Sequence, residues 1–402
     1  MHRKRILILT NRVPYPLNDG GNLAMHAMIQ GYKQQGWEVY LLSMNTSRHR
    51  VEDTVLNTIY TELYAFETVG IDNSITIVGA LKNLLFSKEP EHTARFYKQA
   101  FADKLETVLR QFKPDAVQVE SVFLSSYLPL IKQHAQAKMI LRLHNLEWQI
   151  WRRLASQTGN PIKRWYLQTL SQRMRHYEAQ VWKQYDLLLP ITEVDAAVVM
   201  QYADAAQVLT IPFGIAVDTI KQDNGAEWTG YHIGAMDWLP NQQAIDWFVK
   251  EVWPLVKQKQ PSFTFHFAGR HMPQRYFDMQ ADGITCAGEV DDAAAFIADK
   301  KILLVPLLSG GGIRVKTLEA MAAGKLVIST TIGMQGISAN AGTHYLLADT
   351  PHAFADAIDV ALNNKPQAIA ISSAAAALVS DKYNAATLST ILSRNVEALL
   401  SR

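Results

Sequence analysis

The sequence predicts an α/β protein made of two doubly wound domains, each a parallel sheet with helices on both faces. The chain has 402 residues, which is too many for one ordinary core and suits two domains of about 200 residues each. Short apolar runs alternate with helical patterns along almost the whole chain, as they do in parallel sheets with right-handed crossovers. A polar, glycine-containing stretch around residues 218–230 interrupts the alternation and is typical of a linker.

The first half opens with a strand, a helix and a second strand. The continuous apolar run at 6–10 indicates a strand buried on both faces. Helical spacing at 23–35, closed by Gly36, indicates the helix that follows. Further strands are expected at 39–43, 116–119, 139–143, 187–190 and 208–212, and further helices at 100–112 and 161–184.

The second half repeats this alternation. Strands are expected at 231–234, 263–268, 285–287, 302–306 and 326–329, with helices at 242–257, 293–298, 316–323 and 353–362 and a helical, Ala-rich tail at 366–402. Ligands of doubly wound folds bind at the carboxyl ends of the strands. Residues that directly follow strands are therefore the first candidates for a functional site.

The composition excludes several classes of protein. Hydrophobic residues make up 48% of the chain and charged residues 19%, which indicates a folded domain and not a disordered chain. The 39 basic and 37 acidic residues nearly balance, which argues against a dedicated nucleic-acid binder. Cys286 is the single cysteine, so an intramolecular disulfide and a cysteine-based zinc site are both excluded. Together with the lack of an 18-residue apolar stretch, this predicts a cytoplasmic protein.

Residues 306–324 carry the strongest chemical signal. They read as a strand, a helix, and between them a loop with three consecutive glycines, Gly310, Gly311 and Gly312. Backbone amides before a helix N-terminus can bind an anion, and the helix dipole adds about half a positive charge. Arg314 and Lys316 add two full charges, so the segment predicts a diphosphate site. The alternative is a flexible loop with no ligand.

Glu319 follows about one turn into the same predicted helix. A carboxylate accepts hydrogen bonds from two hydroxyls at once, which fits the diol of a ribose. The alternative is a solvated surface acid. Together with the diphosphate site, this residue indicates a nucleotide ligand.

These motifs resemble those of a known family. The run from Lys316 to Gly324, Lys-Thr-Leu-Glu-Ala-Met-Ala-Ala-Gly, looks like the donor-site signature of family 4 (group 1) glycosyltransferases. Further motifs agree in order, namely Pro14-Tyr15-Pro16 with Asp19-Gly20-Gly21, His144-Asn145-Leu146-Glu147, the run 211–215 and the run 234–241. The resemblance covers nearly the whole chain. It implies the GT-B fold, in which two Rossmann-like domains face a central cleft.

The same resemblance implies the domain organisation and the reaction. Residues 1–218 would form the acceptor-side domain, residues 219–384 the nucleotide-sugar domain, and residues 385–402 a helix that packs back on the first domain. The implied activity is a retaining transfer of a sugar from a UDP- or GDP-sugar to a glycan or lipid-linked acceptor, as in cell-surface polysaccharide synthesis. The sequence does not distinguish the two nucleotides.

The resemblance also assigns donor-binding roles in the second domain. Glu319 matches the signature glutamate that binds the ribose hydroxyls, whereas Gly311 occupies the position of the other signature glutamate, which contacts the donor sugar in relatives. Arg270, directly after a predicted strand, is a further candidate for the phosphates. The remaining expected donor contacts are the loop residues Gly310, Gly312 and Ile313 and the base-reading loop at Gly288 and Glu289.

In the first domain, the resemblance implies that Gly20 and Gly21 approach the donor phosphate or sugar. His144 follows a predicted strand and would lie near the transferred sugar. Asp19 and Glu120 are the candidates for acceptor contacts. The alternatives are a plain strand-to-helix turn at the glycines and a structural histidine.

The expected mechanism is front-face transfer. A double displacement needs two carboxyl groups about 5 Å apart, and no such pair stands out in the sequence. We therefore expect Arg314, Lys316 and the loop amides to stabilise the leaving diphosphate, which then accepts the acceptor proton, with His144 as the third catalytic residue. Neither a metal nor a cofactor is expected beside the nucleotide-sugar.

A basic, aromatic segment lies between Trp151 and Tyr185. The segment contains one acidic residue, Glu178, and seven basic residues, namely Arg152, Arg153, Lys163, Arg164, Arg173, Arg175 and Lys183. Such a helix can rest on an anionic membrane surface, which suits a lipid-linked acceptor at the inner face of a membrane. The alternative is a core-packing helix with a solvated basic face.

Two other classes of function remain open at this point. Some sugar-nucleotide epimerases share the GT-B architecture, but they need acid and base carboxylates around the sugar, where this chain has Gly311. A protein that kept the fold for binding and lost catalysis is the other class. Turnover distinguishes the three: transfer to an acceptor, interconversion of the donor, or nucleotide binding alone.

Overall fold

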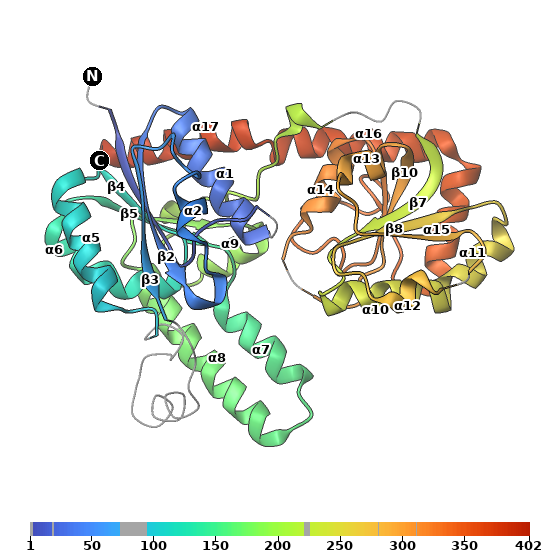
Figure 1. The fold of residues 1–402 in the computed structure, drawn as a ribbon, viewed down its shortest axis with the longest axis horizontal. Helices are drawn as coiled ribbons and strands as arrows, with labels where there is room; N and C mark the ends of the chain where they lie inside the picture. Colours follow the sequence, from blue (N-terminus) through green and yellow to red (C-terminus); the bar gives the residue numbers. More distant parts are fainter. Residues whose placement is uncertain (1–2, 18–19, 73–94, 221–225, 280, 311) are drawn as a thin grey trace. The chain divides into compact units, whose positions relative to one another are not determined.

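The computed structural model describes residues 3–17, 20–72, 95–220, 226–279, 281–310 and 312–402, which form two compact units (Figure 1). The first unit consists of Met1–Pro212 with Ala386–Arg402, and the second of Phe213–Ala385. Each unit contains a six-stranded sheet in which every paired neighbour is parallel. The two-domain α/β fold predicted from the sequence is confirmed.

The sheet of the first unit has the strand order β3-β2-β1-β4-β5-β6. Its strands are β1 (Arg5–Thr10), β2 (Glu38–Thr46), β3 (Ala65–Ile71), β4 (Ala116–Val119), β5 (Lys138–Leu143) and β6 (Leu187–Pro190). Strand β3 was not predicted from the sequence, because its residues are mostly half-buried and so lack a continuous apolar run. The prediction of a full strand at 208–212 is wrong: this segment runs beside β6, with an isolated bridge from Val208 to Leu188 and two backbone hydrogen bonds, and it does not form a strand of the sheet.

Helices cover both faces of this sheet. On one face, α1 (Gly20–Gln34) and α17 (Ala385–Leu400) bury Ile29 and Val396 against Ile6 and Ile8 of β1. On the other face lie α5 (Gln99–Phe112), α6 (Leu128–His134) and α8 (Pro161–Trp182). The remaining α-helices of the unit are α2 (Asp53–Leu56), α7 (Glu147–Gln157) and α9 (Glu193–Val199).

Polar contacts fix α17 to the start of the chain. The indole Nε1 of Trp37 donates to Ser393 Oγ at 2.8 Å. Lys4 forms an ion pair with Glu397 at 2.7 Å. The last helix is therefore an integral part of the first unit.

Helices α7 and α8 form an antiparallel hairpin that projects away from the sheet of the first unit (Figure 1). Both helix starts are capped by side chains, as helix ends require. Asn160 accepts hydrogen bonds from the backbone amides of Ile162 and Lys163 at the start of α8. At the base, the buried carboxylate of Glu178 accepts from the amides of Glu147 and Trp148. Burial raises the pKa of Glu178 to about 8.

The sheet of the second unit has the order β12-β11-β10-β7-β8-β9. Its strands are β7 (Glu227–Ile233), β8 (Phe265–Ala268), β9 (Ile284–Gly288), β10 (Lys300–Val305), β11 (Leu326–Ser329) and β12 (Leu346–Leu347). The helices are α10 (Leu239–Trp247), α11 (Trp253–Lys259), α12 (Gln274–Phe277), α13 (Ala293–Ala298), α14 (Val315–Ala322), α15 (Pro351–Asn363) and α16 (Lys365–Lys382). Rings of Phe248, Phe265 and Phe354 pack together in the core of the unit.

Two predicted helices are divided in the structure. The helix predicted at 242–257 is interrupted by a π-helical turn at Phe248–Val252. The predicted helical tail separates into α16 and α17 near Tyr383. At this break, the amide of Ile215 donates to Tyr383 O at 2.8 Å and the amide of Ala385 donates to Ile215 O at 2.9 Å. The segment at Ile215, which leads into the second unit, is therefore hydrogen-bonded to the segment at 383–385, which leads back to the first unit.

None of the described helices combines the length and the apolar character that crossing a bilayer requires.

Candidate functional site

Backbone hydrogen bonds join the loops after three neighbouring strands of the second unit. Gly234, after β7, donates to Ala268 O at 3.1 Å, and Met236 donates to Arg270 O at 2.8 Å. Gly269, after β8, donates to the carbonyl of Gly288, the last residue of β9, at 2.8 Å. The carboxyl ends of these strands thus form one connected platform.

Gly269 is required by this close approach of the backbone. A Cβ atom at Gly269 would overlap the carbonyl oxygen of Gly234 severely. Because that oxygen belongs to the backbone, it cannot move aside as the end of a flexible side chain would. Any side chain here would force the platform apart.

We expect Gly269→Ala to destabilise the second unit by about 3 kcal/mol, the upper end of the usual cost of overpacking. This corresponds to a fall in Tm of roughly 6–12 °C. Thermal unfolding of the purified variant measures the change. Gly70→Ala is the matched control, because a Cβ there meets no atom within 4 Å. A Gly269→Ala protein as stable as the control would contradict the assignment.

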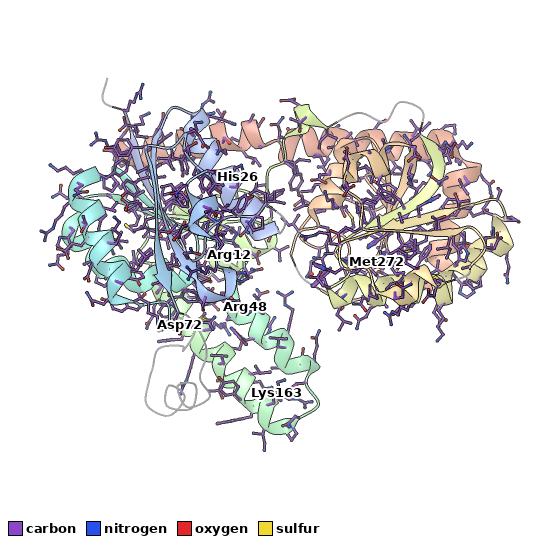
Figure 2. All side chains as sticks on the ribbon, in the orientation of Figure 1. Arg12, His26, Arg48, Asp72, Lys163 and Met272 are labelled. Atoms are coloured by element: carbon purple, nitrogen blue, oxygen red, sulfur yellow. The ribbon has the colours of Figure 1, made fainter. Side chains whose placement is uncertain are left out.

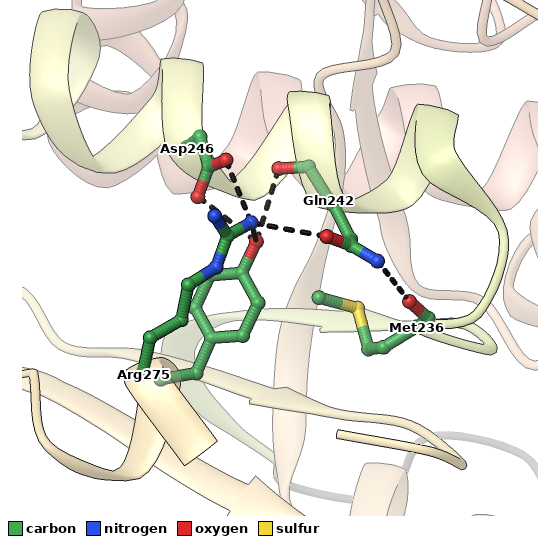
Figure 3. Close-up of polar contacts among 5 residues, drawn as sticks. Met236, Gln242, Asp246 and Arg275 are labelled. Carbon is green, nitrogen blue, oxygen red and sulfur yellow. Dashed lines mark hydrogen bonds and ion pairs between the residues drawn. The ribbon is translucent and has the colours of Figure 1, made fainter. Parts of the chain in front are cut away.

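Side chains of α10 and α12 hold the same platform from one side (Figure 3). Arg275 donates to Asp246 and to Gln242, each at 3.0 Å, and Gln242 donates to Met236 O at 2.6 Å. The hydroxyl of Tyr276 also donates to Asp246, at 2.9 Å. This network was not predicted from the sequence, because Arg275 does not directly follow a strand and matches no motif.

The glycine loop lies between β10 and α14. Gly310 and Gly312 have φ values of +112° and +83°, a left-handed backbone that favours glycine. A Cβ at Gly310 would lie 2.8 Å from the ring of Trp238. Gly311 is outside the described residues. The loop therefore depends on glycine both for its backbone conformation and for its contact with Trp238.

Arg314 is held between this loop and Trp238. Its guanidinium lies 4.9 Å from the centre of the Trp238 ring and donates to Gly312 O at 3.0 Å. Burial lowers the pKa of Arg314 to about 10, so the side chain still carries its charge at neutral pH. The predicted phosphate ligand Arg314 is thus fixed at the start of α14. In the sequence, Trp238 belongs only to the motif 234–241, and no local pattern predicts its contact with Arg314, because the contact joins two distant segments.

Lys316 and Glu319 form an ion pair on the first turns of α14. Their Nζ and Oε2 atoms are 2.8 Å apart. Both side chains keep exposed surface, 48% for Lys316 and 31% for Glu319. An exposed ion pair is worth little in free energy, so a ligand can replace it readily. The sequence predicted a diphosphate as the partner of Lys316 and a ribose as the partner of Glu319, whereas in the structure the two side chains pair with each other.

The other predicted donor residues surround the platform. Arg270 is exposed directly after β8, Gly288 ends β9 with a φ of +68°, and Glu289 is exposed directly after it. The Glu289 carboxylate accepts from the amide of His271 at 3.5 Å. Ile313, which follows the glycine loop and precedes Arg314 in the sequence, is half-buried. Loops after β8 and β9 therefore contact each other through a side chain as well as through the backbone.

In the first unit, Glu120 and His144 lie at the carboxyl ends of β4 and β5. Their Oε2 and Nε2 atoms are 2.8 Å apart. The other carboxylate oxygen of Glu120 accepts from Gln118, which in turn accepts from the hydroxyl of Tyr32 at 2.7 Å. A carboxylate accepts, so Nε2 of His144 carries a hydrogen and, in the neutral ring, Nδ1 is left as an acceptor.

Glu120 does not fit the acceptor contact predicted from the sequence. Its side chain has 0% exposed surface, whereas that of His144 has 21%. Arg142, in the same region of the sheet, is also buried, and two of its guanidinium nitrogens have no hydrogen-bond partner among the described residues. Burial lowers the pKa of Arg142 to about 10, and the charge of Glu120 opposes this shift. Glu120 therefore orients His144 and partly compensates Arg142.

Gly20 and Gly21 are the first residues of α1. A Cβ at Gly20 would meet no atom within 4 Å, so the space beside this helix start is open. Asp19 lies outside the described residues. No cluster of three or more His, Cys, Asp or Glu side chains suited to a metal is found in the described part of the chain.

Comparison with known proteins links the second unit to a family. Residues 229–364 match the family model described as glycosyl transferases group 1. A 44.6 kDa protein in the cps region of Klebsiella pneumoniae is 21% identical over 363 residues, which cover 87% of this chain and 89% of that protein.

Solved structures share the fold of the whole chain. Sucrose-phosphate synthase from Thermosynechococcus elongatus matches with a TM-score of 0.68 and 14% identity, over 99% of this chain and 100% of that one. HepE of Anabaena in complex with UDP matches with a TM-score of 0.68 and 12% identity, over 98% of this chain and 100% of that one. The GT-B fold and the resemblance to group 1 glycosyltransferases are confirmed.

Proposed function

We propose that this chain, which has the GT-B fold and resembles group 1 glycosyltransferases, is a retaining glycosyltransferase. It moves a sugar from a nucleoside-diphosphate sugar to a glycan or lipid-linked acceptor. The observation that carries the proposal is the start of α14, where Arg314 is fixed by Trp238 and Gly312 and is followed by the exposed pair Lys316 and Glu319. Two cations beside a glycine loop and a helix start suit a diphosphate.

The roles of the α14 residues follow from their chemistry. Arg314 and Lys316 contact the diphosphate, and their charges stabilise it as its bond to the sugar breaks. Glu319 leaves its ion pair with Lys316 and accepts from the ribose hydroxyls. Backbone amides of the glycine loop complete the phosphate contacts, while the loops at Arg270, Gly288 and Glu289 surround the nucleoside.

In the first unit, the His144 ring accepts a hydrogen bond from a hydroxyl of the transferred sugar through Nδ1. Glu120 keeps the ring in the tautomer that this contact needs. The leaving diphosphate accepts the acceptor proton, so transfer takes place on one face of the sugar. No metal and no cofactor takes part in this scheme.

Two of the similar proteins support a finer statement. HepE binds UDP in its solved structure, which favours UDP as the nucleotide of the donor. The relative in the cps region favours a place in cell-surface polysaccharide synthesis, with a growing glycan or a lipid-linked sugar as acceptor.

Calorimetric titration with UDP, GDP, ADP and the matching monophosphates tests the proposal. We expect one diphosphate to be selected, and Lys316→Ala to weaken its binding about tenfold, the value of one charge-assisted hydrogen bond. Lys259→Ala is the matched control, because Lys259 also forms an exposed ion pair, with Asp356 at 2.7 Å. Binding of no nucleotide would overturn the proposal in favour of a glycan-binding protein. Interconversion of the donor without transfer would favour an epimerase.

A further inference from the structure

The α7–α8 hairpin has a strong bias of charge. From Trp148 to Tyr177 the sequence contains six Lys or Arg residues and no Asp or Glu. Four of the six lie toward the connection between the helices and are exposed, namely Arg152, Arg153, Lys163 and Arg164. Figure 2 shows Lys163 near the free end of the hairpin. The projecting end of this hairpin is therefore cationic.

Large apolar side chains are exposed at the same end. Ile162 is 77% exposed and Trp165 is 60% exposed. They are three residues apart on α8 and so share one side of the helix. Leu154, near the end of α7, is 43% exposed. Exposed apolar side chains that lie next to each other, as Ile162 and Trp165 do on α8, often mark an interaction site.

These exposed side chains are not part of the packing that holds the hairpin together. Other side chains of the two helices are buried, among them Ala155 on α7 and Leu167 on α8. The hydroxyl of Ser171 donates to Trp148 O at 2.8 Å across the hairpin. The tip is further ordered by the Asn160 cap and by Arg164, which donates to Thr158 O at 2.9 Å. A rigid element therefore presents Ile162 and Trp165 outward.

We propose that the tip of the α7–α8 hairpin docks on an anionic membrane surface. Ile162 and Trp165 enter the interface between headgroups and acyl chains, where tryptophan is favoured. Lys163, Arg152 and Arg153 contact the phosphates of the lipids. The balanced charge of the whole chain, +2, does not favour a nucleic acid as the partner.

The charge of the tip sets the expected strength of binding. Each Lys or Arg near an anionic surface strengthens binding about fivefold, and salt screens this contribution. Burial of the Ile162 and Trp165 side chains in the membrane strengthens binding further, and salt does not weaken this apolar contribution. Binding by the hairpin should therefore require anionic lipid, weaken in high salt and depend on both kinds of residue. The surface would bring a lipid-linked acceptor close to the enzyme, and in this respect it extends the proposed function.

Co-sedimentation with lipid vesicles tests the docking surface. We expect the full chain to bind vesicles of equal parts phosphatidylcholine and phosphatidylglycerol and not vesicles of phosphatidylcholine alone. The double variant Ile162→Ser/Trp165→Ser should bind at least about tenfold more weakly. Lys163→Glu, which changes the charge by two, should bind about 25-fold more weakly. Val194→Ser and Lys132→Glu are the matched controls, since Val194 is 74% exposed on α9 and Lys132 is exposed on α6.

The outcomes separate this proposal from the proposed function. Absence of binding to anionic vesicles, or equal binding by the wild type and the Ile162→Ser/Trp165→Ser variant, would overturn the docking surface. Nucleotide binding by the same variants is measured in solution without lipid and should be unchanged, because the hairpin belongs to the first unit. A protein that binds nucleotide and no vesicle would leave the transferase standing and overturn only the docking surface.

Discussion

Arg314→Ala should lower the rate of sugar transfer by about a hundredfold, the usual effect of removing one preorganised contact to a developing negative charge. The Trp238 ring and Gly312 O already hold the guanidinium in place, so no energy is spent on arranging it during the reaction. Binding of the nucleoside monophosphate should change little, because most of the charge that Arg314 meets develops on the leaving diphosphate. Steady-state kinetics with the selected donor and calorimetry with the monophosphate measure the two effects.

A graded pair of variants makes this test sharper. Arg314→Lys keeps a charge but loses the planar group that stacks on Trp238, and we expect an intermediate rate. Trp238→Ala removes the stacking partner and should reduce the rate several-fold. Lys250→Ala, an 83% exposed lysine of the same unit, is the control. If Arg314→Ala reduced the binding of monophosphate and diphosphate equally and left kcat unchanged, Arg314 would serve ground-state binding and not catalysis.

Glu120→Ala should destabilise the first unit by about 3–5 kcal/mol, the usual result of leaving a buried charge without its partner. The charge left behind is that of Arg142, which is buried together with Glu120. Chemical denaturation monitored by tryptophan fluorescence measures the loss. Glu52→Gln, at an exposed carboxylate, is the control and should be neutral.

A second variant separates the structural role of Glu120 from its role on His144. Glu120→Leu/Arg142→Met removes both buried charges, and such replacements are often neutral for stability. We expect this protein to be about as stable as the wild type and yet to transfer sugar slowly, because nothing then fixes the tautomer of His144. The ¹⁵N shifts of the His144 ring should report a mixture of tautomers in the double variant and one tautomer in the wild type. Wild-type activity in the double variant would show that Glu120 has only a structural role.

The sequence was sufficient for elements with a strong local pattern. The apolar run of β1 is fully buried from Ile6 to Leu9, and such a run has few alternative structures. The edge strand β3 was missed because its half-buried side chains carry no such pattern. The break between α16 and α17 leaves no local pattern, since it depends on hydrogen bonds between Ile215 and residues 383–385; only the family resemblance implied a separate helix at 385–402. Local patterns cannot report contacts between distant segments.

The same distinction applies to the site. Residues at fixed spacing in one segment, Arg314, Lys316 and Glu319, could be found in the sequence. Their partners could not, because Trp238 reaches Arg314 from another loop. Glu120 was placed correctly at the end of a strand, but its burial beneath His144 depends on the neighbouring strand and on α1.

The position of α17 has a consequence for the order in which the protein folds during its synthesis. Residues of α17, Leu392 and Val396, bury the same face of the first sheet as Ile6 and Ile8. On the ribosome, these two isoleucines and α1 emerge long before α17, which completes the cover of this face, and the second unit is synthesised in the interval. Exposed apolar surface on a growing chain is a site for chaperones and for misassembly. The half of the protein that is made first is therefore the half that becomes native last.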